Sequence, residues 1–176
     1  MMSKQHETYP KKLEKRLLKA EEQCRLNGSK LTLKRKQVLS ILLDVKKAIS
    51  AYELIDIFED KFQQNMPPMS AYRVLDYLVN LDLAHKINVA NKFVACAHIG
   101  CENNHDVVQL LFCNQCQNVQ EMPVNPSIAE SFTNELENSG FQLCSQQIEL
   151  NCICNSCSDN HQQSQLQHGS LAFTKG

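Results

Sequence analysis

The chain has 176 residues, enough for one generous domain or two small ones. Hydrophobic residues make up 43% and charged residues 21%, as in an ordinary globular protein. No stretch approaches the ~20 apolar residues of a membrane span, and the first residues lack the apolar core of a secretory signal. We therefore expect a cytoplasmic globular protein without a membrane partner. The net charge is −1, but the charges are unevenly distributed. Residues 1–50 hold 13 Lys and Arg against 5 Asp and Glu, whereas residues 51–176 hold 5 Lys and Arg against 14 Asp and Glu. This division suits an N-terminal part that binds a polyanion, but an ordinary solvated basic helix would show it too.

Apolar residues at helical spacing predict two helices after a flexible tail of residues 1–10. The first runs from Lys11 to about Asn27 and ends at Gly28, and Thr32 can cap the second. Their apolar positions are Leu13, Leu17, Leu18, Ala20 and Cys24 in the first helix and Val38, Leu39, Leu42 and Leu43 in the second.

A capping box predicts the start of a third helix. The Ser50 hydroxyl and the Glu53 carboxylate can each satisfy a backbone amide that the first turn leaves free. The Pro67-Pro68 pair then excludes a continuous helix between Lys61 and Met69. The buried stripe of the third helix is expected to be Ala51, Leu54, Ile55 and Phe58.

A fourth helix is expected from Ser70, as its cap, to about Asn80. Arg73, Tyr77 and Asn80 recur at i, i+4 and i+7, opposite an apolar face, and suit the major groove of DNA: Arg can bond guanine, Asn adenine, and Tyr a phosphate or a thymine methyl. An ordinary solvated helix face would show the same pattern. The residues expected to face inward are Val74, Leu75, Leu78 and Leu81.

After Leu83 the apolar period changes to two, which predicts a β-hairpin with a turn around Ala90-Asn91. Helices that end in a hairpin describe a winged helix-turn-helix, which we assign to residues 11–96. The alternating positions are His85, Ile87, Val89, Phe93 and Ala95.

The second half reads as an α/β domain over residues 107–158, joined to the first by a hinge at residues 97–106. Strands are expected from Val107 to Phe112 and from Ile148 to Cys154. Between them, Asn125-Pro126 can start a helix that Gly140 ends, with an apolar stripe of Ile128, Phe132 and Leu136. Residues 159–176 are polar, Gln/Ser-rich and expected to be disordered. The fold class is therefore α+β.

The chain has nine cysteines, and in a reducing cytosol such cysteines favour metal ligation over disulfides. Four of them form two C-x-x-C motifs, whose thiolates can supply a tetrahedral zinc with all its ligands. Such a site has no open position and would be structural, although a redox dithiol would also use this spacing. The four are Cys113, Cys116, Cys154 and Cys157.

A second group of ligand types gathers between the expected hairpin and the α/β domain. Imidazole, thiolate and carboxylate groups from both sides of a hinge could complete another tetrahedral zinc site and fix the angle between domains. The candidates are His85, Cys96, His98, Cys101, His105 and Glu121.

Together these motifs resemble the ferric uptake regulator family and, within it, the zinc uptake regulators, over roughly residues 11–158. The resemblance rests on Leu31-Thr32-x-x-Arg35, Ser50-Ala51-Tyr52, Tyr72-Arg73-x-Leu75-Asp76, Ala84-His85-Lys86, Cys113-x-x-Cys116 and Cys154-x-x-Cys157. Leu33 stands where the family usually has proline, and Met69-Ser70-Ala71 is one residue longer than the usual spacing.

The resemblance implies a homodimeric repressor that binds double-stranded operator DNA when zinc is abundant and controls zinc uptake genes, with about two zinc ions per monomer. It implies structural zinc on the four paired cysteines and DNA contacts by Tyr52 and Arg73, to which the helix pattern adds Ser70, Tyr77 and Asn80. The regulatory zinc would fall on His85, Cys96, His105 and Glu121. The segment before Cys113 is longer than in relatives, so His98 or Cys101 could replace His105.

Other functions fit the same motifs. The same family includes sensors of iron, manganese, nickel or peroxide, and a zinc-stapled module could bind proteins instead of DNA. An enzyme is not expected, because the chain lacks H-E-x-x-H and the zinc-deaminase motifs, and no small-molecule substrate is expected. The sequence leaves any role of Cys24, Cys144 and Cys152 beyond packing undecided.

Overall fold

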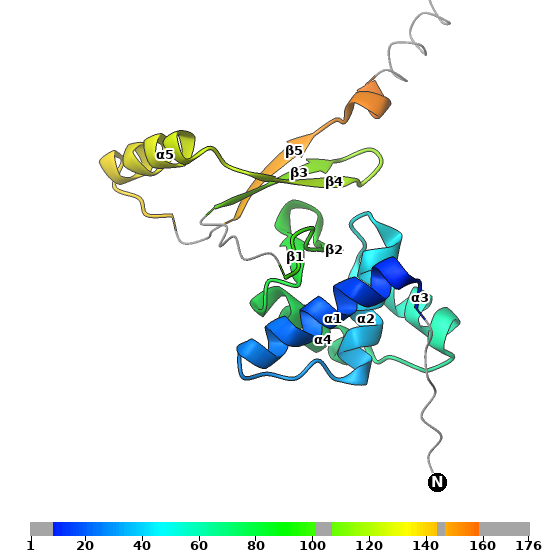
Figure 1. Cartoon of the computed structure of the whole chain (residues 1–176). Coiled ribbons are helices and arrows are strands. Elements are labelled where there is room, and N and C mark those ends of the chain that lie inside the picture. Colours follow the sequence, from blue (N-terminus) through cyan, green and yellow to red (C-terminus); the bar gives the residue numbers. More distant parts are fainter. Residues whose placement is uncertain (1–8, 101–106, 144–146, 159–176) are drawn as a thin grey trace, which may run out of the picture. The chain divides into compact units, whose positions relative to one another are not determined.

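The structure is a computed structural model that describes residues 9–100, 107–143 and 147–158 (Figure 1). The chain divides into two compact units between Asp106 and Val107. The first unit contains four described helices followed by a hairpin, the order expected for a winged helix. Its elements are α1 Lys11–Leu26, α2 Leu33–Val45, α3 Ala51–Phe62, α4 Pro68–Asn80, β1 Ala84–Ile87, the 3₁₀ turn η1 Asn88–Ala90 and β2 Lys92–Ala95.

Helix α2 lies at the centre of the first unit, where it contacts α1, α3, α4 and β2. Two polar side chains are buried on it, and the Ser40 hydroxyl donates to the Gln37 carbonyl at 2.7 Å. A helix surrounded in this way buries more than one face, which is why its buried residues extend beyond the predicted stripe. They are Gln37, Val38, Leu39, Ser40, Ile41, Leu42 and Leu43.

The predicted capping box is present at the start of α3. The Ser50 hydroxyl accepts from the Glu53 amide at 3.1 Å, and the Glu53 carboxylate accepts from the Ser50 amide at 2.7 Å. All four residues of the predicted buried stripe are buried. Thr32 does occupy the cap position of α2, but no cap bond from its side chain is found in the described part of the chain.

The start of α4 differs from the prediction. The helix begins at Pro68 with Pro67 at the cap position, so Ser70 lies inside the first turn and is not the cap. Proline is favoured there because its fixed φ fits a helix and the first-turn amide needs no partner. The Pro-Pro pair therefore starts α4 instead of merely ending α3. In α1, Leu18 was expected on the apolar stripe but is 57% exposed.

Tyr77 also departs from the prediction, because it is half-buried and packs against the core of the first unit. Its hydroxyl donates to the Lys30 carbonyl at 3.0 Å and lies 2.8 Å from the Ser29 hydroxyl. The Arg35 guanidinium lies 3.4 Å from the centre of its ring, a cation–π contact. Tyr77 is therefore not part of the exposed face of α4, because it bonds to Ser29 and Lys30 in the loop before α2.

The predicted hairpin is formed by β1 and β2, which pair antiparallel with His85 opposite Val94. Val89, expected in the first strand, lies in the 3₁₀ turn, and Asn91 adopts a left-handed conformation with φ of 49°. A bridge between Ile49 and Phe93 joins the hairpin to the residues just before α3.

Residues 97–100, expected to begin a hinge, lie on α1 instead. Ile99 is 4% exposed and belongs to the core of the first unit. The Arg16 guanidinium donates to the Cys96 carbonyl at 2.6 Å, and the Gly100 amide donates to the Gln23 side chain at 3.2 Å. The first unit therefore continues past the predicted boundary at residue 96. The remaining expected hinge, 101–106, and the expected tail, 159–176, lie outside the described residues.

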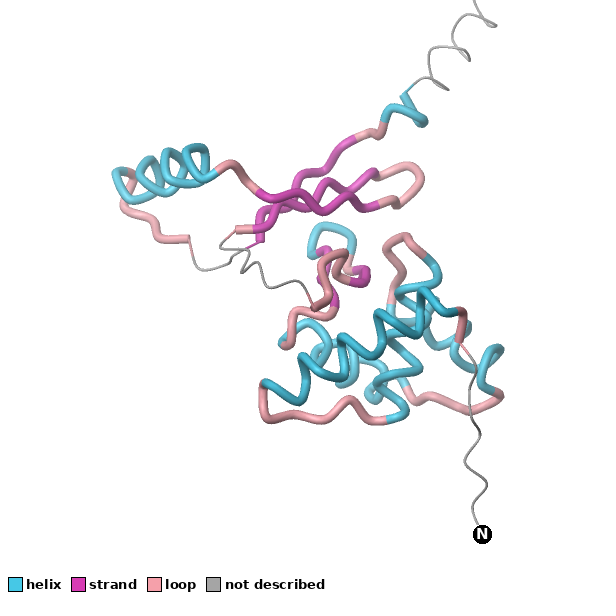
Figure 2. The backbone as a smooth tube through the Cα atoms, in the orientation of Figure 1, coloured by secondary structure: helices cyan, strands magenta, loops and turns pink. Residues whose placement is uncertain are grey.

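The second unit contains a group of strands and a helix (Figure 2). Its sheet has the order β4-β3-β5, with β3 antiparallel to β4 and parallel to β5. Asn125 caps the helix of this unit as predicted, accepting from the Ser127 amide at 3.0 Å. No helix in the described ranges is long and apolar enough to span a bilayer. The elements are β3 Val108–Cys113, β4 Val119–Pro123, α5 Pro126–Asn138 and β5 Gln147–Cys152.

Candidate metal centre

The two C-x-x-C motifs are positioned by neighbouring parallel strands. Strand β3 ends at Cys113, which is in register with Cys152, the last residue of β5. Since the carboxyl ends of parallel strands meet at one edge of a sheet, the turn after β3 and the turn after β5 carry their thiols to the same place. The backbone bond from the Asn114 amide to the Cys152 carbonyl, 3.1 Å long, holds the two turns together.

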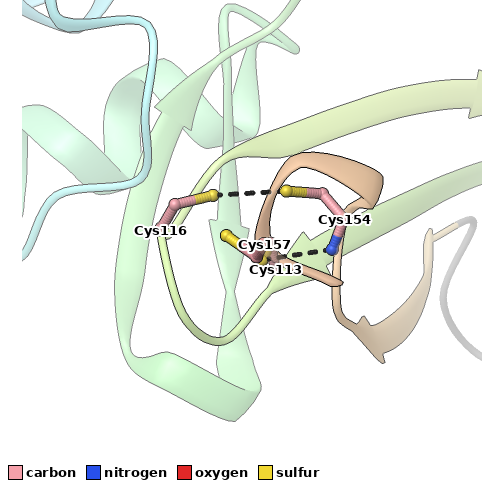
Figure 3. A group of neighbouring side chains, drawn as sticks. All are labelled: Cys113, Cys116, Cys154 and Cys157. Atoms are coloured by element: carbon pink, nitrogen blue, oxygen red, sulfur yellow. Dashed lines mark hydrogen bonds between the residues drawn. The ribbon is translucent and has the colours of Figure 1, made fainter. Parts of the chain in front are cut away.

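The sulfur atoms of the four cysteines lie close together (Figure 3). All lie within 4.8 Å of one another, and the Cys116 and Cys154 sulfurs are 3.7 Å apart. Four thiolates at the usual Zn–S distance of about 2.3 Å would be separated by about 3.8 Å. A disulfide needs about 2.05 Å, so the cluster fits a metal ion better than a sulfur–sulfur bond.

The thiols of this cluster differ in acidity. Backbone amides of Cys116 and Cys154 donate to the Cys113 sulfur and lower its pKa to about 6. Hydrogen bonding from the Cys154 side chain and burial raise the pKa of Cys157 to about 12. The lowered pKa favours the thiolate form of Cys113 at neutral pH. The raised pKa of Cys157 keeps that thiol protonated unless a bound cation compensates the negative charge.

Two of the candidate regulatory ligands come together within the first unit. His85 lies on β1 and Cys96 directly follows β2, and their ligand atoms are within 4.8 Å of each other. The backbone amide of His98 donates to the Cys96 sulfur at 3.3 Å. Glu121 is half-buried on β4 of the second unit, opposite Leu110. His105 and its alternative Cys101 lie outside the described residues, as does Cys144.

The residues expected to contact DNA fall into two groups. Tyr52, at the start of α3, is 63% exposed, and Arg73 and Asn80 are exposed on α4. Ser70 is half-buried, and Tyr77 bonds inside the unit. Of the three residues in the i, i+4, i+7 pattern on α4, Arg73 and Asn80 are therefore exposed and Tyr77 is not.

Three polar residues that sequence reasoning missed support these sites. Arg16 and Gln23 of α1 hold the chain on either side of Ala97, and Lys92 of β2 binds the Glu53 carboxylate at 2.8 Å. This ion pair, with the Ser50 amide, lowers the pKa of Glu53 to about 2. No local pattern identifies these residues, because polar side chains on a helix or hairpin are usually solvated.

Two further cysteines left undecided by the sequence have structural surroundings. Cys24 is buried in the core of the first unit, 3.4 Å from the Tyr77 hydroxyl. Cys152 is half-buried on β5 and stands outside the group of four, with its thiol directed to the Leu150 carbonyl at 3.5 Å.

The chain is similar to a known protein family and to several of its members. The profile of the ferric uptake regulator family matches residues 26–159. The zinc uptake regulation protein of Escherichia coli (strain K12) is 30% identical over 141 residues, covering 80% of each chain, as is that of Shigella flexneri. Among solved structures, a zinc uptake regulator complexed with zinc and DNA is similar at a TM-score of 0.74 and 26% identity, covering 87% of this chain and 99% of that one. Holo XcZur is similar at 0.67 and 29%, covering 81% and 96%.

Proposed function

Since the chain belongs to the ferric uptake regulator family, as the match over residues 26–159 shows, we propose that it is a zinc-responsive transcriptional repressor that binds operator DNA as a homodimer and controls zinc uptake genes. It would act in the cytoplasm, where its nine cysteines stay reduced. Zinc uptake regulators among its relatives, one of them complexed with zinc and DNA, support this choice within the family.

The observation that carries the proposal is the pairing of His85 with Cys96 beside the wing of the DNA-binding unit. A thiolate with an imidazole is a softer ligand set than iron or manganese prefers and suits zinc. Two ligands are too few for a tetrahedral ion, so the site needs partners from elsewhere in the chain. Glu121 and His105 are the proposed partners, with His98 or Cys101 as the alternative to His105.

The regulatory step follows from where these ligands lie in the chain. His85 and Cys96 belong to the winged helix and Glu121 belongs to the second unit, so a shared ion would restrict how the two units are oriented. To move a dimer from nearly all inactive to nearly all active, zinc must favour the active arrangement by about 5.5 kcal/mol. Ligand bonds made only in that arrangement can supply this.

The four paired cysteines would hold a second, structural zinc. When bound, this ion supplies a fourfold covalent-like cross-link and no reaction chemistry, because every coordination position is filled by protein. The lowered pKa of Cys113 favours the thiolate that zinc binds, and zinc binding at a thiol site releases protons.

Dimerisation is supported by the apolar surface of the second unit. Helix α5 has no buried side chain in the described chain, although Ile128, Phe132 and Leu136 form an apolar stripe on it, and Ile128 is 63% exposed. An exposed apolar stripe of this kind would be covered by the same surface of a second copy of the chain. A twofold dimer would read a pseudo-palindromic operator.

Within each half-site, α4 is the proposed recognition helix. Arg73 and Asn80 would read base edges in the major groove, and Tyr52 would contact the backbone from the start of α3. Ser70 lies in the first turn of α4, and its half-buried side chain would contact a phosphate. Tyr77 would support this surface from within the unit.

Titration of operator binding against buffered zinc tests the proposal. A duplex that the wild-type chain selects from a random 30-bp pool at high free zinc serves as the probe. Affinity should rise steeply with free zinc and respond less to iron or manganese. The alternative, a family sensor of another metal or of peroxide, predicts that a different ion or peroxide treatment controls the affinity. Affinity that does not change with free zinc would overturn the zinc-sensing proposal and leave the fold intact.

A further inference from the structure

We propose that Gln23 of α1 is a positioning residue that couples zinc at Cys96 to the recognition helix α4. The inference rests on the proposed function, in which Cys96 is a regulatory ligand and α4 reads DNA. Its basis is a single side chain that bonds both segments.

The Gln23 side-chain amide joins the two segments directly. Its nitrogen donates to the Leu81 carbonyl at 2.7 Å, and Leu81 is the C-cap residue of α4. Its oxygen accepts from the Gly100 amide at 3.2 Å, four residues beyond Cys96. The side-chain amide therefore donates to the end of the recognition helix and accepts from the segment that follows Cys96.

The chain after Cys96 is held too closely to α1 to move alone. Arg16 donates to the Cys96 carbonyl at 2.6 Å, and Ile99 is buried. Gly100 has φ of +70°, and a Cβ there would come within 2.8 Å of the Lys19 Cβ. A displacement of Cys96 on metal binding is therefore passed to α1 and not absorbed in a loose loop.

The end of α4 is the part of the recognition helix that this displacement reaches. A helix leaves its last carbonyls without partners inside the helix, and Gln23 satisfies the one at Leu81. Asn80, the exposed residue next to it, is a proposed base contact. A backbone bond joins the same two segments, because the Leu83 carbonyl accepts from the Cys96 amide at 3.1 Å. Gln23 adds a side-chain connection beside it.

A merely structural role for Gln23 predicts something different. If the side chain only stabilised the fold, its loss would weaken operator binding equally with and without zinc. A coupling role predicts that binding without zinc is unchanged and that the gain caused by zinc shrinks. The ratio of the two affinities therefore separates the two roles.

The test uses the full-length dimer and the wild-type-selected duplex, labelled with fluorescein, in anisotropy titrations at buffered zinc and in chelator. Gln23→Met keeps the length of the side chain and removes both bonds, and Gln23→Glu keeps the acceptor for Gly100 but loses the donor to Leu81. The control is Glu22→Met, on the neighbouring exposed position of α1, whose pairing with Arg25 is on the surface. Zinc affinity is measured separately, with and without the duplex, by competition with a chelating dye.

Both Gln23 variants should lower the zinc-induced gain in operator affinity on the order of tenfold, with unchanged affinity in chelator. The zinc affinity measured on DNA should fall by the same factor, because coupling is reciprocal. Glu22→Met should keep the wild-type ratio. A wild-type ratio in Gln23→Met, or an equal loss with and without zinc, would overturn the inference while the proposed function stands. A wild-type protein with no zinc-induced gain would overturn both.

Discussion

The two units of this chain hold themselves together in different ways. The first packs apolar residues from all four helices and the hairpin into one core, including Phe58 and Phe93. In the described part of the second unit the buried residues are few and all on β3: Val108, Leu110, Phe112 and Cys113. A unit this small buries too little apolar surface to be stable alone, and a metal cross-link is a common substitute. From this difference we expect the stability of the first unit to depend on its core and that of the second on the proposed structural zinc.

Removing one structural ligand should break this contrast most strongly. Cys113→Ser should release the structural zinc and unfold the second unit, because structural zinc sites contribute on the order of 10 kcal/mol to folding. The helices of the first unit should keep their amide signals in NMR spectra. Zinc per chain by native mass spectrometry should fall by at least one, because the proposed regulatory site also takes a ligand, Glu121, from the second unit.

Cys152→Ser is the matched control for that change, because Cys152 is in register with Cys113 but lies outside the group of four. It should keep both zinc content and fold. If Cys113→Ser also kept a folded second unit, the dependence on ligands would be wrong.

Changing the regulatory ligand should affect switching and leave both units folded. Cys96→Ser should bring operator affinity at high zinc down to the zinc-free level, a loss of up to about 10⁴-fold for a complete switch. Anisotropy titration measures the affinity, and sedimentation checks that the dimer persists. His98→Gln should have little effect if His105 completes the site; an equal loss in His98→Gln would show that His98 is a ligand.

A charge on the apolar stripe of α5 should test what covers the second unit. Phe132 is 44% exposed, and Phe132→Glu should weaken dimerisation about 30-fold or more, as expected for an aromatic anchor in an interface. Asn134→Glu places the same charge on the polar side of the same helix and should leave the dimer constant unchanged. Sedimentation equilibrium measures both; equal constants for Phe132→Glu and wild type would exclude α5 from the interface.

Loss of one hydroxyl should sharpen the description of the first unit. Tyr77→Phe removes the bonds to Lys30 and Ser29 while keeping the ring under Arg35, and should cost about 1 kcal/mol of unfolding free energy. Thermal unfolding of the first unit should shift down by about 4–8 °C. No shift would mean that solvent replaces those bonds at no cost.

The smallest effect is expected from the ion pair between hairpin and α3. Burial is partial at Glu53, but the Lys92 bond lowers its pKa from the usual 4.5 to about 2. A lowered folded-state pKa adds stability at pH above 4.5, and this stability is lost as pH falls from 4.5 towards 2. The carboxyl carbon of Glu53, followed by NMR, should titrate near pH 2 in wild type and closer to 4.5 in Lys92→Met. Identical titration in both proteins would rule out the pair as the cause.

Features coded by near neighbours could be predicted from the sequence. The capping box at Ser50, the Asn125 cap and the paired thiols each depend on residues one to three positions apart, and the structure contains all three. The winged-helix and α/β architecture followed from their order.

Features set by distant residues could not. Tyr77 leaves the exposed face because Ser29 and Lys30, nearly fifty positions earlier, bond its hydroxyl. Likewise, Ile99 joins the first core because α1 binds the chain beside it. In each case a contact between elements overrides what the local pattern predicts.

The register of β3 against β5 has a consequence for how this chain can vary. Cys113 and Cys152 are opposite each other in the strand register, which brings the turns after β3 and β5 to one edge of the sheet. The length of the connection through α5 therefore does not determine how far apart the cysteines of the two motifs lie. Insertions between α5 and the strands should therefore be tolerated by the cysteine cluster. A one-residue deletion within β5 would instead shift the strand register and displace Cys154 and Cys157, which follow the strand. In this chain, the phase of β3 and β5 should therefore matter more to the cysteine cluster than the number of residues between the two motifs.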